Sequence, residues 1–114
     1  MSMNELSGEY IDVPDALNRV GGNMDLLKRL LKRFIDGNQI DEMDRVLREG
    51  NMEEAARQAH TVKGVSANLS LVKLRTVTTE LELILKDNLD YSAKLDELKQ
   101  AYDETVKIIQ EITS

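Results

Sequence analysis

The chain contains a single histidine, His60, which Lys63 follows three residues later and Gly64 four residues later. Near neutral pH much of an imidazole is unprotonated, so one ring nitrogen can act as a nucleophile while the other keeps its proton and donates a hydrogen bond. A lysine one helical turn away can offset negative charge that develops on the histidine. These residue types at this spacing favour transfer of a phosphoryl group to and from the imidazole.

Small residues accompany this histidine within a segment that otherwise predicts a helix. Gly64 costs the helix about 1 kcal/mol relative to alanine, and Ala67 continues the strip of small side chains. On a helical wheel His60 lies about 140° from the centre of the apolar stripe, and Gly64 lies roughly opposite that stripe. We therefore expect His60 on an exposed face, where small neighbours let another protein come close.

Each of these features has an ordinary explanation when it is taken alone. A lone histidine is more often a surface or capping residue, Lys63 could simply pair with a carboxylate, and Gly64 could mark a close contact between helices. Their combination on one outward face favours the reactive interpretation. A transition-metal site is not expected, because one histidine without cysteine makes a poor cage. Nothing resembles the strand-borne nucleophile elbow of a Ser-His-Asp hydrolase.

The elements that position this face are predicted from apolar residues at spacings of three and four. Residues 13–20, with Pro14 in the first turn, predict a short helix that ends at Gly21-Gly22. The apolar stripes before and after Gly37 are out of phase, so a helix bends there or its halves face different neighbours. Four residues are expected to cap the later helices: Asn23, Asn51, Ser70 and Asp90.

The predicted fold is all-α, an antiparallel up-and-down four-helix bundle with a short extra N-terminal helix. Helices joined by turns of two to four residues pack antiparallel to their neighbours. The few breakers, six glycines and one proline, favour long helices, and an aromatic content of 4% argues against a sheet. Residues 1–11 are expected to form a loose segment and residues 12–114 a single domain. The helix that carries His60 is expected to bury five positions: Ala55, Ala59, Val62, Ser66 and Leu69.

Composition excludes several classes of function. The net charge is −6, whereas a nucleic-acid binder is normally basic or carries a basic stripe. Four cations do cluster on one predicted helix: Lys28, Arg29, Lys32 and Arg33. Because Asp25 and Asp36 flank them, we interpret the cluster as a solvated helix face. No apolar run is long enough for a membrane span, and the N-terminus lacks the pattern of a signal peptide. With no cysteine, we expect a cytoplasmic protein without disulfides.

The stretch from Ala59 to Leu69, AHTVKGVSANL, is similar to the central motif of the histidine-containing phosphotransfer (HPt) domain of bacterial phosphorelays. That motif is His-x-x-Lys-Gly followed by small residues, usually after an alanine. Residues 16–23 and the LLKRLLKRF that follows resemble the opening helices of the family. Leu81-Glu82 resembles the Leu-Glu that the family places on the next helix. The resemblance covers the chain from about residue 12 to the end.

The resemblance implies a four-helix bundle in which an exposed His60 accepts and donates the phosphoryl group with support from Lys63 and Gly64. The family often has Gln or Glu at the position of Glu82, where the side chain accepts the proton of the other ring nitrogen and orients the imidazole. The alternative is that Glu82 only pairs with Lys86 one turn on, an interaction worth a few tenths of a kcal/mol.

The resemblance also implies the partners. The phosphoryl group is expected to pass from an aspartyl phosphate on one receiver domain to His60 and then to another receiver, so response-regulator receivers and a hybrid sensor kinase are the expected partners. Mg²⁺ is expected from the receiver's acidic pocket, and no cofactor of the chain's own is expected. Receivers are expected to dock around Gly64, Ala67 and Lys86 on a monomer.

Two other interpretations stay open. One is a fragment of the dimerisation helices of a histidine kinase, although those typically have an acidic residue where Thr61 follows the histidine here. The other is a helical binding module with a degenerate motif. Because the chain has no glycine-rich nucleotide loop, it is not expected to be an enzyme that phosphorylates itself from ATP. Many family members have glycine at the position of Ser70, so the turn there is expected to differ slightly.

Overall fold

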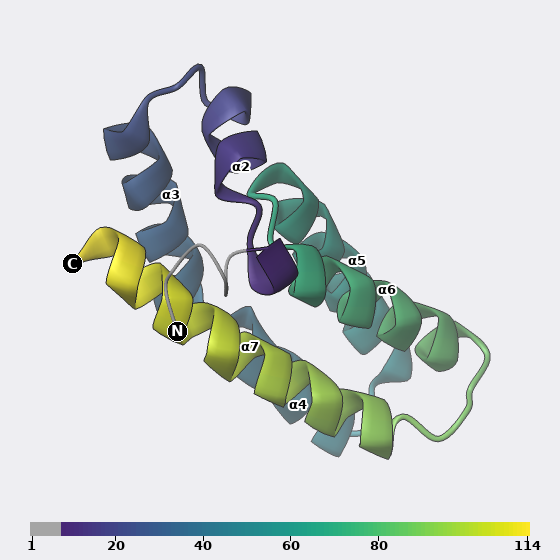
Figure 1. Cartoon of the computed structure of the whole chain (residues 1–114). Helices are drawn as coiled ribbons and strands as arrows, with labels where there is room; N and C mark the ends of the chain where they lie inside the picture. Colours follow the sequence, from purple (N-terminus) through teal and green to yellow (C-terminus); the bar gives the residue numbers. More distant parts are fainter. Residues whose placement is uncertain (1–7) are drawn as a thin grey trace.

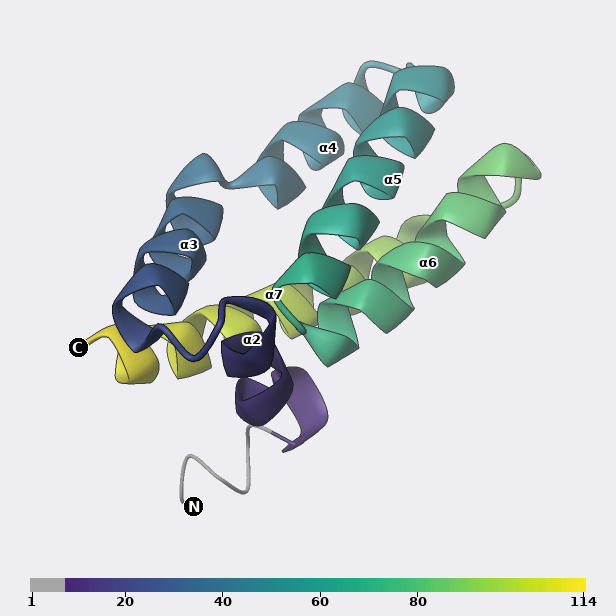
Figure 2. The same ribbon diagram turned by 90° about the horizontal axis from the view of Figure 1, so that it is seen from above.

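The computed structural model describes residues 8–114, and this part of the chain is helical without any strand, which confirms the predicted all-α class. Within residues 11–114 six helices follow one another: α2 (Val13–Arg19), α3 (Met24–Gly37), α4 (Gln39–Arg48), α5 (Met52–Asn68), α6 (Val72–Lys86) and α7 (Ser92–Thr113). Helix α5 packs chiefly on α6, α6 on α7 and α4 on α5, while α7 also contacts α3 and α4. The helices therefore enclose one elongated core, as Figures 1 and 2 show.

The discontinuity predicted at Gly37 is a break between two helices. Helix α3 ends at Gly37, Asn38 adopts a left-handed conformation with φ of 41°, and α4 begins at Gln39. Asparagine is one of the few residues other than glycine that take this conformation readily. The break lets α3 and α4 turn different faces to the core, and these faces bury Leu27, Leu31 and Phe34 on α3 and Ile40, Met43, Val46 and Leu47 on α4.

Two of the predicted helix caps are confirmed. The side chain of Asn23 accepts a hydrogen bond from the Leu26 backbone N–H at 3.0 Å, and the side chain of Asn51 accepts one from Glu54 N–H at 3.1 Å. Each bond satisfies one of the backbone donors that the first turn of a helix leaves without a partner. The cap of Asn51 fixes where the helix that carries the histidine begins.

The predicted cap at Ser70 is wrong. Helix α6 begins after Leu71 without a side-chain cap. Ser70 instead has a left-handed backbone with φ of 56°, and its hydroxyl donates to Asp15 of α2 at 2.5 Å. The turn between α5 and α6 therefore requires the conformation that glycine adopts most easily. The serine at this position adds a hydrogen bond to α2 that glycine could not make.

The N-terminal part of the chain is attached to the same turn. Residues 1–7 of the segment predicted to be loose lie outside the described residues, but residues 8–10 are helical and Ile11 is fully buried in the core. The backbone N–H of Asp12 donates to the Ser70 carbonyl at 3.0 Å. The end of the predicted loose segment is thus packed, because Ile11 is part of the hydrophobic core.

The burial of α5 sets the direction of the histidine. All five positions predicted to be inward on this helix are buried, from Ala55 to Leu69. On α7 the prediction is less accurate, since Tyr102 and Val106 are only partly buried while Thr105 and Ile108 take the central positions.

Within residues 8–114, no helix has both the length and the apolar character that a bilayer crossing requires.

Candidate functional site

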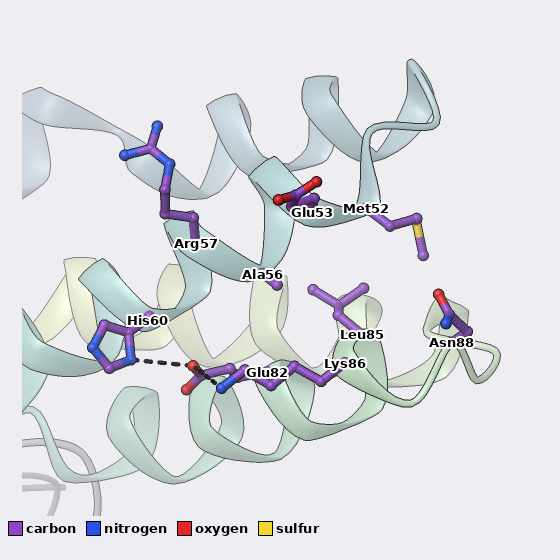
Figure 3. Close-up of a pocket in the computed structure, with 9 residues that line it drawn as sticks. All are labelled: Met52, Glu53, Ala56, Arg57, His60, Glu82, Leu85, Lys86 and Asn88. Carbon is purple, nitrogen blue, oxygen red and sulfur yellow. Dashed lines mark hydrogen bonds and ion pairs between the residues drawn. The ribbon is translucent and has the colours of Figure 1, made fainter.

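His60 projects from the middle of α5 toward α6. Its side chain is 69% exposed, and its Nδ1 lies 3.1 Å from Oε2 of Glu82 (Figure 3). Ala59 and Val62 on the opposite side of α5 are fully buried, which holds the helix in this rotation. The apolar stripe thus presents one edge of the imidazole to α6 and leaves the rest of the ring to solvent.

Glu82 is the buried centre of the site. Its side chain is only 5% exposed, yet three basic side chains converge on its carboxylate. Lys63 Nζ lies 2.7 Å from Oε1, and Lys86 Nζ lies 3.1 Å from Oε2, the oxygen that also faces His60. The possibility that Glu82 only pairs with Lys86 is therefore wrong, because the carboxylate reaches both helices.

The surroundings of Glu82 keep it ionised. Burial by itself raises the pKa of this carboxyl, but hydrogen bonds from Lys63, Lys86 and His60 outweigh burial and lower the pKa from 4.5 to about 2. An ionised carboxylate accepts hydrogen bonds and donates none. A neutral His60 must therefore carry its proton on Nδ1, which leaves the lone pair of Nε2 free on the exposed side of the ring.

The strip of small residues on α5 is open. A Cβ built on Gly64 would meet no atom within 4 Å, so the explanation of Gly64 as a close helix–helix contact is wrong. Gly64 is exposed and Ala67 is half-buried. Neither residue has an ion pair with Glu82, and both lie on the turns of α5 that follow His60. The space next to the imidazole is consequently clear toward the C-terminal end of the helix.

A groove runs from His60 in the opposite direction, between the first half of α5 and the end of α6. It has a volume of about 620 Å³, with His60 and Glu82 toward one end and Asn88 toward the other (Figure 3). Lys86 lines it, in agreement with its expected place beside the histidine. The apolar part of its wall is formed by three residues that sequence reasoning missed: Met52, Ala56 and Leu85. Their helical spacing from His60 and Glu82 was the available signal.

The described residues contain no group of three or more His, Cys, Asp or Glu side chains arranged to hold a metal ion. The cluster at Glu82 joins one carboxylate to two lysines and one imidazole. It can hold a proton on the buried side of the imidazole and present an unprotonated nitrogen with two ammonium groups nearby. These are the requirements of a histidine nucleophile that receives an anionic group.

Comparison with known proteins adds one finding. A family model described as "Hpt domain" matches residues 23–108, three quarters of the chain and the whole of the cluster around Glu82. No curated protein and no solved structure gave a significant match.

Proposed function

Since this chain belongs to the Hpt domain family, we propose that His60 is the phosphoacceptor of a phosphorelay intermediate. Hpt domains serve in histidine phosphotransfer and interact with receiver domains. The observation that carries the assignment to His60 is the contact between its Nδ1 and the buried, ionised Glu82 at 3.1 Å. That contact orients the only imidazole of the chain with its nucleophilic nitrogen outward.

The proposed reaction starts from an aspartyl phosphate on a receiver domain. The lone pair of His60 Nε2 attacks the phosphorus, an N–P bond forms, and the P–O bond to the receiver's aspartate breaks. The aspartate leaves as a carboxylate with the bonding electrons, while the Nδ1 proton stays beside Glu82. Reversal of these steps with a second receiver passes the phosphoryl group on. No proton has to leave the imidazole in either direction.

The remaining residues support this step in different ways. Lys63 and Lys86 keep Glu82 ionised, and their ammonium groups offset the charge that a phosphoryl group adds beside the imidazole. Gly64 leaves space for the phosphoryl group and the receiver that carries it. We propose that Mg²⁺ is held by the acidic pocket of the receiver, and that the chain acts as a monomer that does not phosphorylate itself from ATP.

The test is incubation with phosphorylated receivers of the source organism. The chain should acquire an acid-labile label, and His60→Gln should abolish the label while leaving helicity and the melting temperature unchanged, because the side chain is largely exposed. Acid-labile label that persists on His60→Gln, or a wild-type chain that no receiver labels, would overturn the assignment. Label acquired from ATP alone would favour a kinase fragment, and a dimeric solution mass would support that outcome.

A further inference from the structure

The basic cluster of α3 differs from most charged surfaces of residues 8–114, although Lys73 and Arg75 of α6 also have no carboxylate within 4.0 Å. Most lysines and arginines of residues 8–114 have a carboxylate partner within 4.0 Å. No such partner exists within the described residues for four cations of α3: Lys28, Arg29, Lys32 and Arg33. The flanking Asp25 and Asp36 do not neutralise them in this way. A protein with a net charge of −6 therefore keeps a concentrated positive surface on one helix.

This surface borders an apolar groove. The groove has a volume of about 490 Å³ and lies where the end of α3 and the start of α4 meet the C-terminal half of α5. Four residues form its apolar wall: Leu30 and Phe34 from α3, and Val65 and Leu69 from α5. Arg33 lines the same groove, so a cation stands at the edge of an apolar depression.

The four cations divide between two flanks of α3. Arg29 lies one turn before Arg33, and residues four apart lie on the same side of a helix, so these two form a ridge beside the groove. Lys28 and Lys32 are also four residues apart but lie about 100° further round the helix from the ridge, and neither lines the groove. The helix thus provides a ridge pair and a matched pair of equal charge on its other flank.

The groove lies on the flank of α5 next to the face that carries the histidine. Val65 directly follows Gly64, and Asn68, which also lines the groove, lies eight residues after His60. At 1.5 Å per residue, this separation is about 12 Å along α5. A small domain is about 30 Å across. A partner centred on His60 therefore extends over the groove and the ridge.

We propose that the Arg29–Arg33 ridge and the adjoining groove select among receiver domains. They favour receivers that place one large apolar side chain in the groove and present carboxylates to the two arginines. This inference rests on the proposed function and adds to it the feature that makes a receiver a good partner. Charge complementarity supports it, because both arginines lack carboxylate partners within residues 8–114 and Arg33 lines an apolar groove that the chain leaves open.

The experiment compares two double variants of equal charge change, Arg29→Glu/Arg33→Glu and Lys28→Glu/Lys32→Glu. The probe is the receiver that labels wild-type His60 fastest in the screen described above. Its Kd for each variant is measured by calorimetry at low and at high salt. The ridge variant should raise Kd about tenfold or more at low salt, and the control variant less than about threefold, because close charge pairs contribute more than distant ones. Salt should reduce the difference.

Two further measurements separate the possible failures. Phosphoramidate, a small phosphodonor that needs no docking surface, should label both double variants as fast as wild type. Replacement by arginine of the receiver carboxylates that are needed for tight binding to wild type should restore the receiver's affinity for the ridge variant. Equal effects of the two double variants would show a general charge effect and overturn the inference, as would no effect of either. If no receiver labels wild type, the proposed function itself fails.

Discussion

Glu82→Gln offers the most direct test of the electrostatics of the site. The carboxyl of Glu82 has its pKa lowered from 4.5 to about 2 in the folded chain, and its side chain is 5% exposed. At 1.36 kcal/mol for each pKa unit, this difference corresponds to about 3 kcal/mol of preference for the ionised form in the folded state. Glutamine keeps the shape and can still accept a hydrogen bond, but it cannot carry the charge.

The sign follows from linkage. A carboxyl whose pKa is lower in the folded than in the unfolded chain contributes stability that is fully present above the unfolded pKa of about 4.5. That stability is lost as the pH falls toward the folded pKa of about 2, and less than half of it, about 1 kcal/mol, remains at pH 3. The difference in unfolding free energy between wild type and Glu82→Gln should therefore be largest near pH 7 and shrink by about 2 kcal/mol by pH 3.

The assay is urea unfolding followed by circular dichroism at several pH values between 7 and 3. Glu111→Gln is the control, because this exposed residue of α7 has no ion pair within the described residues; its effect should stay within about 0.5 kcal/mol. A difference for Glu82→Gln that is the same at pH 7 and pH 3 would refute the argument that the lysines and His60 hold Glu82 ionised.

Substitutions at four other residues test the surroundings of the site and the turn that follows α5. Gly64→Gln should slow phosphotransfer yet raise stability by about 0.5–1 kcal/mol in thermal melts, because the glutamine side chain enters open space and glycine is the poorer helix former. A lower melting temperature would mean that the glutamine side chain clashes with a neighbouring part of the fold. Lys63→Ala should slow phosphotransfer or shorten the half-life of the phosphohistidine, whereas Lys86→Ala should change mainly the encounter rate and its salt dependence; a Lys63→Ala chain with a normal rate and half-life would remove that lysine from the site. Ser70→Ala should be about 1 kcal/mol less stable to urea than Ser70→Gly, because both variants lose the bond to Asp15 but only alanine has a Cβ that strains the left-handed backbone; equal stabilities would show that the conformation costs nothing.

Local patterns predicted much of the fold. The inward positions of α5 from Ala55 to Leu69 were predicted correctly because a helix repeats its faces at a fixed angle along its own sequence. The caps at Asn23 and Asn51 were predicted for a similar reason, since each accepts a bond from a residue three positions later. Such interactions depend only on neighbours in the chain, so a single sequence contains the information.

The errors arose where distant segments meet. Serine is a residue type that often caps helices, but the hydroxyl of Ser70 donates a hydrogen bond to Asp15, which is 55 residues away in the sequence. The contact of His60 with Glu82 depends on how α5 and α6 slide against each other, which no periodicity within one helix records. The resemblance indicated that contact. Helical spacing from His60 and Glu82 was a signal for Met52 and Leu85 separately, but only the packing of α5 on α6 brings both into one groove.

The attachment of α2 to Ser70 has a consequence for the order in which the chain folds. Helices α4 to α7 pack on their sequence neighbours across short turns, so their assembly costs little loop entropy. The bond between Asp15 and Ser70 must close a loop of 55 residues and is expected to form late. We therefore expect amide hydrogens of α2 to exchange with solvent faster than those of α5, and equal protection of the two helices would contradict this order. Faster exchange in α2 would mean that the helix that carries the histidine folds before the N-terminal segment docks. Local opening of α2 would then leave the imidazole and its carboxylate in place.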